Sequence, residues 1–530
     1  MSRAVRPARA QPPTDAPVEE GRPGRQDRRT GAGEGRQRWS WWTGFAILTL
    51  LGGLWSLANP VFSVPDEPAH VVYAAAAVRG ELFAPTDGID TTVTVPATYR
   101  NANTAAACFI FYATVPAGCA EPFVAQSGDA QVVTTAGRYP PAYYLYAGSA
   151  TLLADGATAV YLMRFLTLLA CAALLASAFS SARRSRSPWP VTALVLACTP
   201  MVLFFMGGVN PQGPELAAGI ALWSSALALF SSVRGPDGVA GPVSGRLLAR
   251  CLITMAVLAV VRPMSIAWLG LIVIVVLVAR STVPTFRAVL RRRATILGGL
   301  AIGLLVGASA AWILARDALR QWSRPVDMEA SRAALFSVSK LDDEVREMVG
   351  IFGWLDTPAP GLVYLVWFGA VGLVVGLAAA VANRRERLAL IVIVAVSVMV
   401  PVASELSSYG ESGFAWQGRY ILAFSAGLVV LSGYVLVGRV PAALSVRVCR
   451  GLVVAVGAAH VVAFVGNLNR YVHGIGGFWW LDAPGWRPPV PAAVLILSFL
   501  AVTAVGVLLL VRDFTRTASP ATASELTQPS

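Results

Sequence analysis

Long apolar stretches alternate with short polar stretches along most of the 530-residue chain. A helix that crosses the hydrocarbon core of a membrane needs about 20 mostly apolar residues. By that measure the pattern predicts about twelve spanning helices, two of them short and separated only by Arg262-Pro263, where the proline ends or kinks a helix. The chain is therefore predicted to be an all-α polytopic membrane protein. The predicted spans are 41–62, 157–181, 189–209, 214–233, 249–261, 264–280, 295–315, 360–382, 388–403, 420–437, 451–466 and 490–511.

Composition and charge favour the same class. Hydrophobic residues make up 56% of the chain and charged residues only 13%, whereas a soluble domain carries about 25% charged residues. The net charge of +13 would also fit a nucleic-acid-binding protein, but the basic residues gather in short runs between apolar stretches, at 183–186, 291–293 and 384–387. This is the positive-inside pattern of cytoplasmic loops. We therefore expect no nucleic-acid partner, and a multi-pass protein of the cell inner (cytoplasmic) membrane with both termini in the cytoplasm.

The polar segments divide the chain into three parts. Residues 1–39 are rich in Arg, Pro and Gly and nearly free of apolar side chains, so we expect a disordered cytoplasmic tail there. A second disordered tail is expected at 516–530. The transmembrane domain would then comprise 40–515, and its largest segments outside the membrane would be 63–156 and 316–359.

The first of these outer segments is expected to contain short helices, including helices at the membrane interface. One is predicted at 66–80, and the tyrosine-rich stretch 138–154 is typical of a helix that lies where amphipathic rings settle. The segment also holds Cys108 and Cys119. Outside the cytoplasm, two thiols in one long polar loop tend to pair, so we expect a disulfide between them.

Asp66, Glu67 and His70 lie just after the first predicted span. Acidic side chains next to hydrocarbon are costly and mark functional sites. If a helix begins at Pro65, the three side chains share one patch. In one interpretation, Asp66 or Glu67 removes a proton from an attacking hydroxyl as general base. In another, all three bind a divalent cation, Mg²⁺ or Mn²⁺, that neutralises a phosphate. In a third, the acids only stabilise a helix N-terminus.

Other polar residues also fall on the predicted outer side. Asn210 joins two spans, where a tight helical hairpin is the structural alternative. Asp356 precedes a span and would otherwise cap it. Arg419 opens a span against the positive-inside bias, and its guanidinium would grip a phosphate in bidentate fashion or else extend to the interface. The substrate-binding candidates are His70, Asn210, Asp356, Gln417, Arg419 and Tyr420.

Four local motifs resemble a bacterial family of predicted polytopic membrane proteins allied to the GT-C glycosyltransferases. They are Pro65-Asp-Glu-Pro-Ala-His70, Tyr139-Pro-Pro-Ala-Tyr-Tyr144 followed by the arginine-containing helix at 162–167, Gly353-Trp-Leu-Asp-Thr-Pro358 and Gln417-Gly-Arg-Tyr420. The resemblance covers roughly residues 60–440. It implies a GT-C-like bundle in which the first outer loop supplies the acidic catalytic residue and outward-facing arginines hold a lipid phosphate. Carried over by position, Asp66 is the base, Glu67 lies beside it and Arg419 binds the phosphate.

Two functions follow as hypotheses. The first is a membrane glycosyltransferase that moves a sugar from a polyprenyl-phosphate donor to a cell-envelope glycan or lipid acceptor outside the cytoplasm, in contact with membrane lipids. The second is a transporter or lipid flippase for envelope precursors, which would need polar groups near the middle of the membrane and often has repeated, broken helices. The acids at the outer lip and the lack of a sequence repeat favour the enzyme, and a non-catalytic scaffold is a third alternative.

Overall fold

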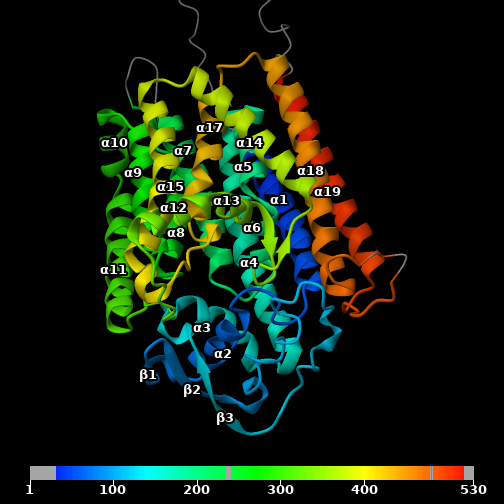
Figure 1. Ribbon diagram of the computed structural model, residues 1–530. Coiled ribbons are helices and arrows are strands. Elements are labelled where there is room, and N and C mark those ends of the chain that lie inside the picture. Colours follow the sequence, from blue (N-terminus) through cyan, green and yellow to red (C-terminus); the bar gives the residue numbers. More distant parts are fainter. Residues whose placement is uncertain (1–30, 234–239, 321, 478, 480–481, 519–530) are drawn as a thin grey trace, which may run out of the picture.

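The computed structural model describes residues 31–233, 240–320, 322–477, 479 and 482–518. Within them, helices pack side by side into one tall bundle, with a small sheet at one end (Figure 1). Residues 1–30 and 519–530, which make up most of the two predicted tails, lie outside the described residues. Residues 31–39 belong to helix α1 (Gly31–Ala58), and 516–518 end helix α19 (Ala492–Ala518).

All twelve predicted apolar segments contain helix, but the count of spans is lower. Among the described residues, eight helices are long and apolar enough to cross a membrane. A ninth would be the pair α5 (Pro188–Ala197) and α6 (Pro200–Met206), bent by 65°. The predicted number of twelve is therefore not confirmed, because three segments are short: α8 (Gly245–Val260), α9 (Ser265–Arg280) and α16 (Leu422–Ser425) with α17 (Gly427–Val435). The remaining long helices are α4 (Gly156–Ala182), α7 (Gln212–Val233), α11 (Arg293–Ala315), α14 (Gly361–Val381), α15 (Arg384–Ser412) and α18 (Ala442–His473).

The basic loops gather at one end of the bundle. Arg183, after α4, pairs with Asp513 near the end of α19 at 2.6 Å. Arg280 at the end of α9 and Arg439 after α17 both pair with Glu386 at the start of α15. Helix α10 (Val283–Leu290) lies at this end too, opposite the sheet (Figure 1). This grouping is what the positive-inside interpretation requires of loops that share one side of a membrane.

The orientation can be tested with one cysteine at each end of the bundle. Thr86 is exposed in the sheet, and Arg186 is exposed at the basic end. A Thr86→Cys variant should react with a membrane-impermeant thiol reagent in intact cells, whereas Arg186→Cys should react only after lysis. The four free native cysteines are buried, so they add little background. The opposite labelling pattern would invert the topology.

The first outer segment contains a sheet that the helical expectation did not include. Strands β1 (Thr86–Asp87), β2 (Asp90–Pro96) and β3 (Asp129–Thr134) form an antiparallel sheet in the order β1-β2-β3. Strand β2 alternates between buried and exposed side chains, and its Thr and Val residues are β-branched, which favours strands over helices. Helices were predicted in this segment, and no strand was assigned to this stretch.

Two helices in this segment match the predicted ones, but only one of them lies at the surface. Helix α2 (Glu67–Ala77) is buried along nearly its whole length, because the sheet covers one side and α3 (Ala142–Gly148) another. It is thus a core helix of the outer region, not an interfacial one. After α3, Leu152 and Leu153 are 60% and 85% exposed, which fits the predicted apolar contact with the interface.

The second outer segment reaches back toward the bundle. It contains α12 (Ala330–Ser339), α13 (Leu341–Gly350) and a hairpin of β4 (Ile351–Phe352) and β5 (Thr357–Pro358). Helix α13 packs against α6 and against the short turn 418–420. Phe352 of β4 is buried against Trp55 of α1, with ring centroids 5.1 Å apart. These contacts bring the motif around Asp356 and the motif around Arg419 to the same level as the end of α1.

Candidate functional site

The site begins with an unusual backbone turn between α1 and α2. Asp66, immediately before α2, has φ 60° and ψ 4°, in the left-handed region. Only a few per cent of residues other than glycine adopt positive φ, and such positions persist where the surroundings hold them. The turn separates two consecutive acids: the side chain of Asp66 is 52% exposed and that of Glu67 is fully buried. The two carboxylates therefore do not act as a pair.

Glu67 is held by a buried arginine in α4. Arg164 Nε donates to Glu67 Oε1 at 2.8 Å and Arg164 Nη2 to Glu67 Oε2 at 2.6 Å. Its other three N–H bonds go to the carbonyls of Ser56, Asn59 and Pro60. All five donors of the guanidinium are thus used, and both side chains have 0% exposure. This ion pair fixes the end of α1 and the turn that follows it.

The same carboxylate also binds two backbone N–H groups. Glu67 Oε2 accepts from Phe62 N and Oε1 from Val209 N, both at 2.9 Å. With four donors around it and no exposed surface, Glu67 has no free lone pair directed at a substrate. The structure thus separates the two acids that the sequence left equivalent, and only Asp66 faces open space.

Asn210 and Gln212 connect this turn to the second half of the site. Asn210 Nδ2 donates to the carbonyl of Pro65 at 2.9 Å. Gln212 Nε2 donates to the carbonyl of Arg419 at 2.7 Å, and its own N–H is held by Asn210 Oδ1. The loop between α6 and α7 therefore fixes both Asp66 and Arg419. Asn210, predicted to bind substrate, is 3% exposed and holds the acidic turn.

Arg419 reaches Asp66 although the two residues are 353 positions apart. Arg419 Nη2 lies 3.3 Å from Asp66 Oδ2. Its Nε donates to Gln417 Oε1, and the guanidinium lies over the rings of Phe205 and Tyr420 at 5.2 and 5.3 Å. Arg419 Nη1 is buried and has no hydrogen-bond partner among the described residues. A buried N–H without a partner is costly, so this atom is a candidate to bind a ligand oxygen.

The turn that carries Arg419 requires glycine beside it. A Cβ on Gly418 would lie 1.8 Å from the carbonyl oxygen of Glu344 in α13. The N–H of Gly418 donates to Glu347 Oε2 at 2.6 Å. Burial raises the pKa of Glu347, and the Gly418 N–H and the Arg419 charge oppose that rise. Helix α13 therefore packs directly against the Gln417–Tyr420 motif and holds it in place.

Asp66 and its neighbours line a cavity of about 1300 Å³. The lining includes most of the predicted substrate-binding residues, namely His70, Asn210, Gln417 and Tyr420. It also includes five basic side chains that come from four separate parts of the chain: Arg138, Arg262, Arg320, Arg324 and Lys340. Aromatic and serine side chains complete the wall, among them Phe111, Trp322, Trp416, Ser404, Ser407 and Ser408. The cavity wall mixes polar and apolar side chains, carries several cations and includes two exposed carboxylates, those of Asp66 and Glu411.

The predicted metal ligands diverge. His70 shares a 2.9 Å hydrogen bond with the hydroxyl of Tyr144, and Glu67 is buried in its ion pair with Arg164. Among the residues that the structure describes, no group of three His, Cys, Asp or Glu side chains could hold a metal ion. Burial lowers the pKa of His70 to about 3, so the ring is neutral near pH 7. The residues present do not fit the divalent site expected from the sequence.

Asp356 lies outside the cavity lining. Its Oδ2 accepts from Arg470 Nη2 at 2.9 Å, and the two side chains are 8% and 1% exposed. Its Oδ1 accepts from Thr357 Oγ1. Leu355, the preceding residue, does line the cavity. The motif around Asp356 thus contributes to the wall through its neighbour, and the acid itself is occupied by a structural ion pair.

Many lining residues were not singled out from the sequence as site residues, among them Arg138, Lys340 and Glu347. Arg138 donates to the carbonyls of Asp317 and Arg320 at 2.6 and 2.9 Å, so it joins the two outer segments. Lys340 pairs with the buried Glu405, and Glu347 binds the Arg419 turn. The sequence carried one usable signal, since Lys340 is the only lysine in the chain. The others are visible only once distant segments are brought together.

Comparisons with known proteins place the chain in a family. A family profile described as "Predicted membrane protein (DUF2142)" matches residues 48–428, a range that includes the four motifs. Among solved structures, ArnT from Cupriavidus metallidurans in the apo state matches at 14% identity and TM-score 0.41, over 92% of this chain and 77% of that chain. The same protein bound to undecaprenyl phosphate matches at 15% identity and TM-score 0.39, over 90% and 76%. No curated protein sequence matches. Since the family profile covers well over half of its length, the chain belongs to the DUF2142 family of predicted membrane proteins.

Proposed function

We propose that this protein is a membrane glycosyltransferase that moves a sugar from a polyprenyl-phosphate donor to a cell-envelope acceptor on the outer face of the membrane. One observation carries the proposal. An exposed carboxylate, Asp66, and a buried guanidinium, Arg419, meet at 3.3 Å beside a cavity of about 1300 Å³ that Asp66 lines. Glycosyl transfer from a phosphate needs both a proton acceptor and a cation, and this pair supplies them at one place.

In this proposal Asp66 activates the acceptor. Its carboxylate takes the proton of an acceptor hydroxyl while that oxygen forms a bond to the anomeric carbon of the donor sugar. The bond between the anomeric carbon and the phosphate oxygen breaks, and polyprenyl phosphate leaves with the electron pair. The left-handed backbone at Asp66 supports this role, because strained residues concentrate at functional sites.

Arg419 would bind the phosphate of the donor and of the leaving lipid. Its free Nη1 is a donor without a partner among the described residues, and charge-assisted hydrogen bonds to phosphate are the strong ones. Gln417 orients the guanidinium through Nε, and the Tyr420 ring lies beside it. Basic side chains in the lining of the neighbouring cavity, such as Arg138, would add to the attraction for an anionic headgroup.

The remaining candidates take supporting roles in this proposal. Glu67, with Arg164, would position the Asp66 turn instead of reacting. Asn210 would hold the same turn through the carbonyl of Pro65. His70 lines the cavity as a neutral ring whose Nδ1 is bound to Tyr144, so Nε2 is the ring nitrogen that would form a hydrogen bond to substrate. We assign no step to a metal ion.

Binding of a polyprenyl phosphate tests the role of Arg419. The Arg419→Ala protein, reconstituted in nanodiscs, should bind undecaprenyl phosphate more weakly by about 2–5 kcal/mol, a typical cost of losing one partner of a buried charged contact. Arg419→Lys should lose less, because it keeps the charge but not the planar fork. Exposed Arg183 at the opposite end of the bundle is a matched control, and Arg183→Ala should bind normally. Undecaprenyl phosphate that binds equally well to wild type and Arg419→Ala would contradict the assignment. Binding without any transfer to envelope glycan in cells would favour the transporter interpretation.

A further inference from the structure

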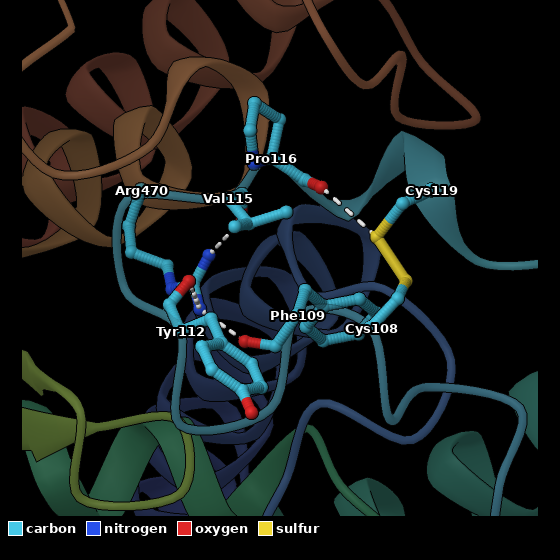
Figure 2. The surroundings of a disulfide bond; sticks show 7 residues. All are labelled: Cys108, Phe109, Tyr112, Val115, Pro116, Cys119 and Arg470. Carbon is cyan, nitrogen blue, oxygen red and sulfur yellow. Dashed lines mark hydrogen bonds between the residues drawn. A yellow bond between two sulfur atoms is a disulfide. The ribbon is translucent and has the colours of Figure 1, made fainter.

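A loop closed by a disulfide borders the cavity, and the proposed reaction assigns no role to this loop. Cys108 and Cys119 form the disulfide that the sequence predicted, with Cα atoms 6.1 Å apart. Figure 2 shows Arg470 of α18 reaching into the loop between them. Its Nη1 donates to the carbonyl of Val115 at 2.7 Å, and its Nη2 to those of Phe109 and Tyr112 at 2.7 and 3.2 Å. The loop is therefore fixed from the inside as well as at its ends.

The same arginine connects this loop to the motif around Asp356. Asp356 balances the charge of Arg470 at 2.9 Å. Trp354, two residues before Asp356, donates from Nε1 to the carbonyl of Phe62 at 3.2 Å. This hydrogen bond connects the Asp356 motif to the turn before Asp66. Three segments far apart in sequence thus form one rigid rim: the disulfide loop, the Gly353–Pro358 motif and the Asp66 turn.

Phe111 is the residue that this rim presents to the cavity. It lines the cavity, is 67% exposed, and has φ 64°. Its ring meets that of Trp354 edge to face, at 5.7 Å between centroids. Leu355, also in the lining, has φ 63°. A strained backbone that exposes a large apolar ring is doubly unfavourable, and such positions persist at ligand clamps.

We propose that Phe111 is the floor of a sugar-binding subsite in this cavity, where its ring packs against the apolar C–H face of a pyranose or furanose. The ligand class follows from the proposed function and from the polar part of the lining, since serine hydroxyls and guanidiniums, such as those of Ser407, Ser408 and Arg324, suit sugar hydroxyls. An aromatic face carries partial negative charge and attracts polarised C–H groups. This inference rests on the proposed function. The experiment below decides whether the bound sugar is that of the donor or that of the acceptor.

The test compares ligands with and without a sugar. Wild type and variants in nanodiscs are titrated with undecaprenyl phosphate, with undecaprenyl phosphate bearing glucose, mannose, galactose or arabinose, and with the methyl glycosides of the same sugars. The quantity measured is the gain in affinity that the sugar confers over undecaprenyl phosphate alone, or the affinity for the glycoside. Phe111→Ala should reduce this quantity by up to about tenfold, and Phe111→Trp should preserve it. Affinity for undecaprenyl phosphate itself should not change.

The chain offers a matched control at the next position. Tyr112 is an aromatic residue of the same loop and is 61% exposed, but it does not line the cavity, so Tyr112→Ala should behave as wild type. Cys119→Ser should partly reduce the gain in affinity that the sugar confers, because the loop loses its disulfide. A loss confined to the lipid-linked sugars would place the subsite with the donor, and a loss confined to the glycosides with the acceptor.

Three results would overturn the subsite. They are an unchanged sugar gain in Phe111→Ala, an equal loss in Tyr112→Ala, and a wild-type protein that gains nothing from any of the sugars. None of these touches the proposed function, whose own test is whether binding of undecaprenyl phosphate depends on Arg419. Failure of the subsite and failure of the function are therefore separate outcomes.

Discussion

Asp66→Asn should abolish glycosyl transfer while leaving the protein folded and able to bind undecaprenyl phosphate. A positioned general base contributes about 10²–10⁴-fold to a rate, and an amide cannot accept the proton. The substitution is mild for the fold, since asparagine tolerates the left-handed backbone found at this position. The side chain is half-exposed, so no buried space is emptied. Transfer is measured as envelope glycan, by mass spectrometry, in a strain that lacks the gene and carries the variant.

Asp87→Asn is the appropriate control for this experiment. Asp87 is an exposed acid of the same outer region, in strand β1, and does not line the cavity. It should support glycan synthesis at the wild-type level. Full activity of Asp66→Asn would refute the base assignment. Loss of activity together with loss of folded protein would show only a structural role, and the melting temperature of the purified variant distinguishes the two.

Glu67→Gln should instead destabilise the fold. The substitution leaves the guanidinium of Arg164 buried without a counter-charge, and breaking a buried ion pair from one side costs about 3–5 kcal/mol. Two backbone N–H groups also lose part of their acceptor. The expected result is a clearly lower melting temperature in detergent, or no folded protein after size-exclusion chromatography. Glu121→Gln, a change at an exposed acid in the same outer region, should have almost no effect.

A double substitution separates charge from packing. Glu67→Gln combined with Arg164→Met removes both charges, so it should cost less than the sum of the two single changes. A Glu67→Gln protein that is as stable as wild type but inactive would move the catalytic base from Asp66 to Glu67. Substitution of Asp66 is thus expected to abolish transfer without unfolding the protein, whereas substitution of Glu67 is expected to destabilise the fold.

Much of the architecture could be read from the sequence because membrane segments obey local rules. A run of about 20 apolar residues can satisfy its backbone in a membrane only as a helix, and all twelve apolar segments contain helix. The number that crosses a membrane was less predictable, since length alone does not decide whether short helices such as α8 and α9 extend from one side to the other. The small sheet escaped the prediction because its strands are short and pair across a long loop.

The candidate site, too, was predictable from the sequence only in part. Sequence alone singled out Asp66, Arg419 and their motifs as candidates, because charged residues at the lip of apolar spans are rare and costly. Sequence could not separate Asp66 from Glu67, since neighbouring acids differ only through the left-handed turn between them and through Arg164, 97 positions away from Glu67. Nor could it reveal that Asp356 is bound by Arg470, or that Phe111 faces the cavity. Helix content and membrane character depend on nearest neighbours along the chain, whereas the state of each charged group depends on partners that only the tertiary structure brings within hydrogen-bonding distance.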